Sequence, residues 1–316
     1  MEFFAGLETV PSGFGPSAVT IGKFDGVHTG HRSVLAGLRA AARERGLVSV
    51  VVTFDRNPLA LVAPERCPRP LVSNAQKREL LAAAGVDATL MLTFDAALAA
   101  LEPEQFVRSV LIDALGARLV LAGGDFRFGR GHAGDVALLR ELGARFGFEV
   151  VLIDDVAAEA AAGERRASST WVRELLDAGR VEEAARVLGR PATVRSVVVE
   201  GEKRGRALGY PTANLDPGLL EGFLPADGVY AAWATVDGVR HPAAVSIGNN
   251  PTFEGVPQHQ AEAHLLDVDM DLYGRTLELA FVARLRGMER FDGMEALVAA
   301  IRGDAEQARR ILASHG

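Results

Sequence analysis

The sequence predicts an α/β protein with two domains: an N-terminal doubly wound parallel sheet, and a smaller antiparallel barrel or sandwich that ends in a helix. The chain has 316 residues, and a typical domain has about 100–200. Strand and helix patterns alternate over about the first 170 residues, which is typical of a parallel sheet with helices on both faces. From about Pro191 onward, short strand patterns separated by turn signals replace this alternation.

The first part alternates apolar runs with segments whose apolar residues recur every three or four positions. We expect strands at 17–22, 47–54, 88–94, 118–123 and 148–154. The run at 47–54 is apolar throughout, as in a strand buried on both faces. Helices are expected at 33–46, 76–85, 103–116, 135–147, 169–179 and 181–189. Gly46 suits a helix end, and Pro103 suits a first helical turn.

The second part contains short strands and one long helix. The strands are expected at 192–201, 228–236, 238–248, 260–268 and 276–285. Residues 296–312 form an amphipathic helix, and Asp292 and Glu295 before it are spaced as a capping box. We place the boundary between the two domains near residue 188.

Composition excludes several classes of protein. The chain is 48% hydrophobic and 24% charged, which is ordinary for a globular protein. Its net charge of −7 argues against nucleic-acid binding, which needs a basic surface. No apolar run approaches the roughly 18 residues of a membrane span. The single cysteine, Cys67, excludes an internal disulfide and a CxxC site, so we expect a cytoplasmic protein.

Two histidines stand between the first strand and the first helix, in the segment TIGKFDGVHTGHRSVL. Ligands of doubly wound sheets bind at the carboxyl ends of strands, and a helix N-terminus suits phosphate. His28 and His31 are three residues apart, so they share a face if the helix begins here. They could then donate hydrogen bonds to phosphate oxygens in a transition state, with Gly30 allowing a nucleotide close approach. The alternative is a pair of surface histidines near a helix cap.

A second cluster follows the strand at 118–123. Asp125 stands at the carboxyl end of that strand, among glycines that allow close backbone approach. Phe126 and Phe128 could stack on a planar ring, or they could belong to the core. Gly129–Gly134 spell GxGxxG, but the strand ends six residues too early for a dinucleotide fingerprint.

A third cluster precedes the helix at 169–179. Ser169 and Thr170 are natural N-cap residues for that helix. A helix N-terminus with hydroxyl groups and a flanking arginine, Arg166, is also a good polyphosphate site. Both interpretations can hold together.

The candidate chemistry of the second domain lies in two segments. GEKRGRALGYPTANL is rich in glycine and basic residues, and the oxygens of Thr212 and Asn214 could hold ATP phosphates and Mg²⁺. Glu262 lies in the strand pattern HQAEAHLL, where it could be an ordinary exposed strand carboxylate. A metal triad of His259, Glu262 and His264 is disfavoured, because strand geometry places His259 on the opposite face.

Several motifs, in order, resemble the prokaryotic bifunctional riboflavin kinase/FAD synthetases. GKFDGVHTGH resembles the nucleotidyltransferase signature, TFDRNP the family's second loop, GGDFRFG its third segment and RRASSTWVRELL its SSTxIR segment. GRALGYPTANL resembles the kinase motif, and DLYG and LRGMERF resemble late landmarks of its barrel. The sequence departs from the family's common residues at Lys23, Asn57 and Ser196.

The resemblance implies a Rossmann-like FMN adenylyltransferase domain at 1–187 and a riboflavin kinase β-barrel domain at 188–316. It implies His28, His31 and Glu262 as catalytic residues. For the adenylyltransferase it implies ATP contacts from Gly22, Phe24, Asp25, Gly30, Arg166, Ser169 and Thr170. It implies flavin or nucleotide contacts from Asn57, Asp125, Phe126 and Phe128, and kinase contacts with ATP and Mg²⁺ from Gly205, Thr212 and Asn214.

The implied function is ATP-dependent phosphorylation of riboflavin to FMN, followed by adenylylation of FMN to FAD with release of pyrophosphate. Mg²⁺ is the implied cofactor, and the partners are small molecules, with neither nucleic acid nor a membrane. A homo-oligomer is compatible with the sequence. Two alternatives stay open: another nucleotidyltransferase with an accessory barrel, and a non-catalytic regulator that binds flavin or nucleotide.

Overall fold

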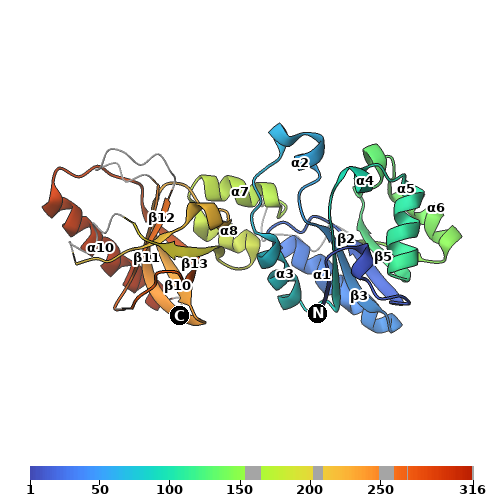
Figure 1. Cartoon of the computed structure of the whole chain (residues 1–316), viewed down its shortest axis with the longest axis horizontal. Helices are drawn as coiled ribbons and strands as arrows, with labels where there is room; N and C mark the ends of the chain where they lie inside the picture. The colour runs from blue at the N-terminus through green and yellow to red at the C-terminus, as the bar shows by residue number, and fades with distance from the viewer. Residues whose placement is uncertain (154–164, 202–208, 249–259, 269, 315–316) are drawn as a thin grey trace. The chain divides into compact units, whose positions relative to one another are not determined.

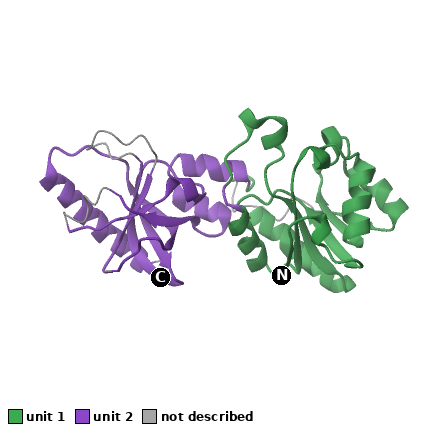
Figure 2. Cartoon of the chain, viewed as in Figure 1, with its two compact units in different colours: residues 1–70, 74–167 green, residues 71–73, 168–316 purple. Residues whose placement is uncertain are grey.

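The computed structural model describes residues 1–153, 165–201, 209–248, 260–268 and 270–314. The chain divides into two compact units (Figure 2). The first unit comprises residues 1–70 and 74–167, and the second comprises residues 71–73 and 168–316. Residues 168–187, which the sequence analysis assigns to the first domain, therefore pack with the second unit.

The first unit contains a six-stranded sheet in which every pairing is parallel (Figure 1). The order across the sheet is β1-β4-β3-β2-β5-β6. The strands are β1 (Glu2–Phe4), β2 (Ser17–Ile21), β3 (Val48–Phe54), β4 (Ala88–Leu92), β5 (Ala117–Gly123) and β6 (Glu149–Ile153). The parallel sheet is confirmed. The edge strand β1 is not among the predicted strands, because its three residues are too few for a recognisable pattern.

Helices cover both faces of this sheet. On one face lie α1 (Thr29–Arg45) and α3 (Asn74–Ala83), whose Leu35, Leu38 and Leu81 are fully buried. On the other lie α5 (Pro103–Phe106), the π-helical η3 (Val107–Ala114) and α6 (Val136–Phe146). Successive residues of one strand enter opposite cores: Val51 of β3 packs with α1, and Val52 packs with the other layer. This two-sided burial explains the continuous apolar runs of the sequence.

Short elements occupy the loops of the first unit. They are η1 (Leu7–Thr9), α2 (Leu59–Val62), η2 (Pro64–Arg66), α4 (Ala96–Ala99) and η4 (Arg130–His132). The chain runs from β2 to β3 on one side, whereas β5 lies on the other side of β2. The strand order therefore reverses between β2 and β5, and the carboxyl ends of these two strands flank the place where doubly wound sheets bind ligands.

The second unit contains a closed antiparallel barrel. Six strands pair in the ring β13-β10-β11-β12-β8-β7, which closes because β7 also pairs with β13, and the two-residue β9 adds to β7. The strands are β7 (Ala192–Val199), β8 (Ala213–Leu215), β9 (Glu221–Gly222), β10 (Gly228–Val236), β11 (Val239–Gly248), β12 (Gln260–Leu265) and β13 (Thr276–Arg286). Buried and half-buried residues alternate along β7 and β12, as in a barrel with a filled interior.

Helices cover parts of the barrel exterior. They are α7 (Ser169–Asp177), α8 (Val181–Leu188) and α10 (Met294–Ala313), and a 3₁₀ turn, η6, spans Pro217–Leu219. The bidentate pair of Arg286 on β13 with Asp304 on α10, 2.7 Å at its shortest, fixes the last helix to the barrel. The expected capping box is wrong: Gly293 is the N-cap and makes no side-chain cap bond. Among the described residues, no helix is long and apolar enough to cross a membrane.

Candidate active sites

The two histidines of the first unit form one stacked pair. His28 is the N-cap of α1, and its Nδ1 accepts a hydrogen bond of 3.4 Å from the backbone N–H of His31. The ring centroids lie 3.7 Å apart with an interplanar angle of 22°. A Cβ at Gly30 would lie 3.3 Å from the His28 ring, so a side chain there would crowd the pair. The helix therefore begins at Thr29, four residues earlier than the apolar pattern predicts, because the cap is a histidine.

The loop that carries the pair has an unusual backbone. Phe24 and Val27 have φ angles of 48° and 40°, a region that non-glycine residues rarely occupy and β-branched residues least of all. Phe24 is 2% exposed, a Cβ at Gly22 would lie 3.1 Å from its ring, and its ring centroid lies 5.1 Å from that of His31. Asp25, between them, stays half-buried. Such strained backbone conformations persist where the surrounding structure holds them in place, and they are common at functional sites.

His31 is neutral in the ligand-free protein at neutral pH. Burial is the largest cause that lowers its pKa well below the ordinary value of 6.5, and the charges of His28, Lys23 and Lys77 lower it further. Within the described residues, the Nδ1 of His31 is buried and has no hydrogen-bond partner. A buried polar atom without a partner is costly, so this atom is poised for a ligand.

Binding of ATP is expected to make His31 take up a proton. An anion beside the ring favours its charged form, so the pKa rises on binding, and proton uptake is confined to the pH window between the two pKa values. Isothermal titration calorimetry at a series of pH values, in two buffers with different ionisation enthalpies, measures the uptake. The difference in proton uptake between the wild type and His31→Gln gives the contribution of His31, because the protons exchanged by ATP itself are the same in both experiments. An identical buffer dependence of the two proteins would contradict the expectation.

The residues after β5 divide between core and surface. Asp125 is exposed and close to Gly123, where a Cβ would lie 3.0 Å from its carboxylate. Phe126 is half-buried and stacks on Phe128 at 5.5 Å, whereas Phe128 is 6% exposed and belongs to the core. The structure therefore places Phe128 where the core alternative puts it, and leaves Asp125 and Phe126 accessible. β5 ends at Gly123, well before the GxGxxG segment at 129–134, as the sequence analysis expects.

The other predicted adenylyltransferase residues are placed as follows. The Oδ1 of Asn57 accepts a hydrogen bond of 3.1 Å from the backbone N–H of Leu59, at the start of α2. Arg166 is exposed in the first unit, and Ser169 and Thr170 are the first residues of α7 in the second. The N-cap of α7 is Ser168, whose Oγ accepts 3.2 Å from Trp171 N–H. The cap expected at Ser169 or Thr170 is therefore wrong by one residue.

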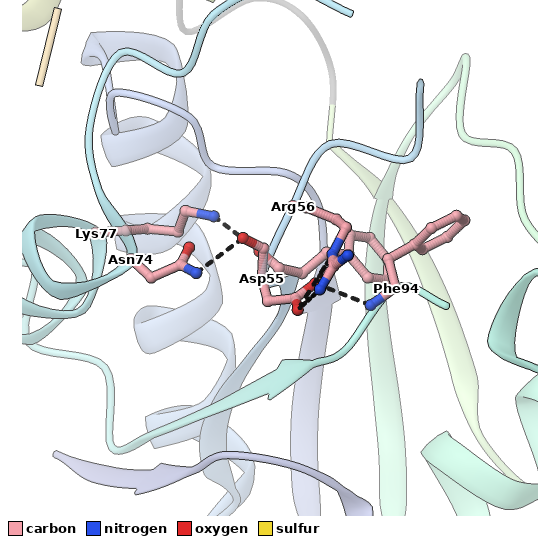
Figure 3. Close-up of polar contacts among 6 residues, drawn as sticks. Asp55, Arg56, Asn74, Lys77 and Phe94 are labelled. Atoms are coloured by element: carbon pink, nitrogen blue, oxygen red, sulfur yellow. Dashed lines mark hydrogen bonds and ion pairs between the residues drawn. The ribbon is translucent and has the colours of Figure 1, made fainter. Parts of the chain in front are cut away.

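A polar network at the ends of β3 and β4 was missed by the sequence analysis (Figure 3). Asp55 Oδ1 accepts 2.9 Å from the backbone N–H of Phe94, and the Asp55 carbonyl accepts 2.8 Å from Asn74 Nδ2. Hydrogen bonds from Arg56 and the Phe94 N–H outweigh the opposing effect of burial and lower the pKa of Asp55. Lys77, one helical turn beyond Asn74, donates 2.9 Å to the Phe54 carbonyl. An acidic residue directly after a predicted strand was the available signal.

In the second unit, the predicted kinase residues that the structure describes lie together. Glu262 of β12 pairs in register with Asn214 of β8 and with Ser246 of β11. Thr212 Oγ1 donates to Glu262 Oε2 at 3.4 Å. All these side chains are half-buried, whereas Ala213, between Thr212 and Asn214, is buried in the barrel interior. Alternation along short strands thus gathers one carboxylate, one amide and two hydroxyl groups.

Asn214 also fits closely against the backbone. A Cβ at Gly201 would lie 2.3 Å from Asn214 Nδ2, so no other residue fits at 201 without displacing the amide. Gly205, the remaining predicted kinase residue, lies outside the described residues, as does His259. Among the described residues, no group of three His, Cys, Asp or Glu side chains could hold a metal ion.

His264 is a further residue of this site that the sequence analysis did not assign. Its Nδ1 lies 2.8 Å from the Pro211 carbonyl, which can only accept, so Nδ1 carries the proton. The Tyr210 ring meets the His264 ring edge-on at 5.4 Å. A hydrogen bond with Tyr210 raises the pKa of Arg302 on α10. Glu262 and His264, two residues apart on β12, therefore form hydrogen bonds with Thr212 and Pro211, respectively.

Comparison with known proteins shows the family to which the chain belongs. Residues 12–170 match the FAD synthetase family, and residues 188–312 match the riboflavin kinase family. A bifunctional riboflavin kinase/FMN adenylyltransferase of Escherichia coli (strain K12) is 38% identical over 92% of this chain and 91% of the relative. The chain belongs to the bifunctional riboflavin kinase/FMN adenylyltransferases. A member of the same family from Pseudomonas fluorescens is 38% identical over 99% of this chain and 98% of its own length.

Solved structures show the same fold over nearly the whole chain. A crystal structure described as a macrolide-efflux protein from Streptococcus pneumoniae matches with a TM-score of 0.84 and 32% identity, covering 97% of this chain and 98% of that one. With both family matches present, this bifunctional enzyme phosphorylates riboflavin and adenylylates FMN. Its substrates are riboflavin, FMN and ATP, and FAD is the final flavin product.

Proposed function

We propose that the two activities are divided between residues 1–187 and residues 188–316, with His28 and His31 serving adenylyl transfer and Glu262, Thr212 and Asn214 serving phosphorylation. The observation that carries the proposal is the stacked histidine pair at the N-terminus of α1, beside the point where the strand order reverses. Helix N-termini and the carboxyl ends of strands at such a point favour phosphate groups. The functional boundary at residues 187 and 188 is part of this proposal.

In adenylyl transfer, a phosphate oxygen of FMN attacks the α-phosphorus of ATP, the bond from that phosphorus to the β-phosphate oxygen breaks, and pyrophosphate leaves. The attacking phosphate is already anionic, so no general base is needed. Catalysis comes from in-line placement and from hydrogen-bond donors that meet the developing charge. His28 and His31 supply those donors. We assign ATP contact to Gly22, Asp25, Gly30 and Arg166 and to the main chain of Phe24, and we assign flavin contact to Asn57, Asp125 and Phe126. Ser169 and Thr170 stay predicted ATP contacts.

In phosphorylation, the 5′-hydroxyl oxygen of riboflavin attacks the γ-phosphorus of ATP, its proton passes to Glu262, and ADP leaves. The half-buried carboxylate already accepts a hydrogen bond from Thr212, so it is held in place before substrate arrives. The hydroxyl of Thr212, the amide of Asn214 and the carboxylate of Glu262 form an oxygen-rich donor set, which fits Mg²⁺. We assign Thr212 and Asn214 as its holders; when bound, Mg²⁺ neutralises charge on the phosphates.

The expected location is the cytoplasm, and the expected partners are small molecules rather than nucleic acid. The net charge of −7 and the single cysteine, Cys67, which is free, support this proposal.

Mg²⁺ removal is expected to stop phosphorylation. The purified chain, incubated with riboflavin, ATP and Mg²⁺, should form FMN first and FAD later. Chromatography of the reaction mixture separates and quantifies the flavins. With a chelator in place of Mg²⁺, FMN formation should fall to background, because the charge on the transferring phosphoryl group is no longer neutralised. FMN formation at the full rate under chelation would contradict the assignment of Thr212 and Asn214 as metal holders.

A further inference from the structure

Lys77 of α3 is buried to an extent that its contacts do not explain. The residue is 7% exposed, and lysine is almost never that buried without a partner of opposite charge in direct contact. Its Nζ donates one hydrogen bond, of 2.9 Å, to the Phe54 carbonyl at the end of β3 (Figure 3). An ammonium has three donors, and within the described residues this carbonyl is the one hydrogen-bond partner of Nζ.

The ammonium lies within electrostatic reach of three parts of the first unit. Burial lowers its pKa, and the carboxylates of Asp25, in the loop after β2, and Asp55, after β3, oppose that effect. Its own charge is among the causes that lower the pKa of His31. The loop with the histidines, the end of β3 and the helix α3 therefore meet around one buried cation.

We propose that Lys77 is a positioning residue for adenylyl transfer, which holds the loop between β2 and α1, residues 22–28, against the end of β3 without touching substrate. This inference rests on the proposed role of the histidine pair. The loop adopts two strained backbone conformations, at Phe24 and Val27, and these need attachment to persist. Attraction between the ammonium and Asp25, with the ammonium anchored on Phe54, provides it.

The test compares Lys77→Met with Lys77→Arg. In Lys77→Met, kcat for adenylyl transfer is expected to fall on the order of 10- to 100-fold, because misplacement by about 1 Å is enough for that loss. The KM values for ATP and FMN should stay near wild type, and Lys77→Arg, which keeps the charge and a donor, should recover part of kcat. The charged groups that act on the pKa of His31 are His28, Lys23 and Lys77. Loss of one cation raises the pKa of His31, so the pH profile of kcat should move to higher pH.

Two controls make the result specific. Arg78→Met removes a cation from the next position of the same helix, where the guanidinium is exposed over the Phe3 ring at 4.3 Å, and should leave both activities unchanged. Phosphorylation of riboflavin should be normal in every variant. If Lys77→Met fails to fold, Lys77→Gln keeps an N–H donor for Phe54 without the charge, and the same expectations apply.

Three outcomes distinguish the possibilities. A raised KM for ATP with unchanged kcat would overturn the inference, because Lys77 would then bind substrate. Wild-type kinetics of Lys77→Met alongside an inactive His28→Ala would also overturn it, while leaving the role of the histidines intact. Wild-type FAD formation in His28→Ala as well would overturn the proposed function itself.

Discussion

Replacing His28 and His31 together by alanine is expected to abolish FAD formation and leave FMN formation near the wild-type rate. Removal of one preorganised donor from a transition state costs about 10²–10³ in kcat, so loss of the pair should exceed that range. The phosphorylation residues lie on β12, β8 and the segment before β8, in the other compact unit. The measurement supplies FMN with ATP in one reaction and riboflavin with ATP in another, and separates the flavins.

His28 is also a helix cap, so the alanine variant confounds chemistry with stability. Loss of a side-chain cap costs about 1 kcal/mol. The single variant His31→Leu removes one donor and leaves His28 in place as the cap, so kcat for FAD formation should still fall by about 10²–10³. His132→Asn replaces an exposed histidine of the same unit and should be silent. A folded variant that loses both activities would contradict the division of labour between the units.

Glu262→Gln is expected to stop phosphorylation of riboflavin and spare adenylylation of supplied FMN. The glutamine keeps an oxygen that can accept from Thr212, so the local geometry should survive, but it cannot take the proton of the attacking hydroxyl. Loss of a general base costs about 10²–10⁴ in rate. Initial rates of FMN formation from riboflavin, and of FAD formation from FMN, measure the two effects in one preparation.

A matched control for Glu262 exists on the same barrel. Glu278 of β13 is likewise half-buried on a strand, but β13 is not a neighbour of β12 in the ring. Glu278→Gln should therefore phosphorylate riboflavin normally. If Glu262→Gln instead kept its kcat and raised the KM for riboflavin, the carboxylate would bind the substrate and would not act as the base.

The parallel sheet and the barrel strands could be predicted because each carries a repeated pattern. Two-sided burial makes β3 continuously apolar, and one-sided burial makes β12 and β13 alternate. The missed strands β1, β8 and β9 have two or three residues each, too few to show a period. Their pairing is decided by partners distant in sequence, such as Leu90 opposite Phe4, and no local pattern records that.

The motifs supplied the candidate functional residues, but the contacts among those residues depend on the fold. Neither the stacking of His28 on His31 nor the burial that lowers the pKa of His31 can be read from spacing alone. Lys77 was unremarkable in sequence, because it is one polar residue in an amphipathic helix. Its role depends on Phe54 and Asp25, which lie 23 and 52 positions earlier in the chain. Whether Phe128 belongs to the core could likewise be decided only from its neighbours in the folded structure.

The closure of β7 onto β13 bears on how this protein behaves when concentrated. A closed ring hides backbone groups that an open sheet offers to other chains, and within the described residues the added strand β9 is only two residues long. The open sheet of the first unit has two outer strands: β1 is three residues long, and β6 begins at Glu149, which Arg45 contacts at 3.4 Å. Short or charged edge strands of this kind resist edge-to-edge aggregation. We therefore expect neither unit to pair its strands readily with those of another copy of the chain.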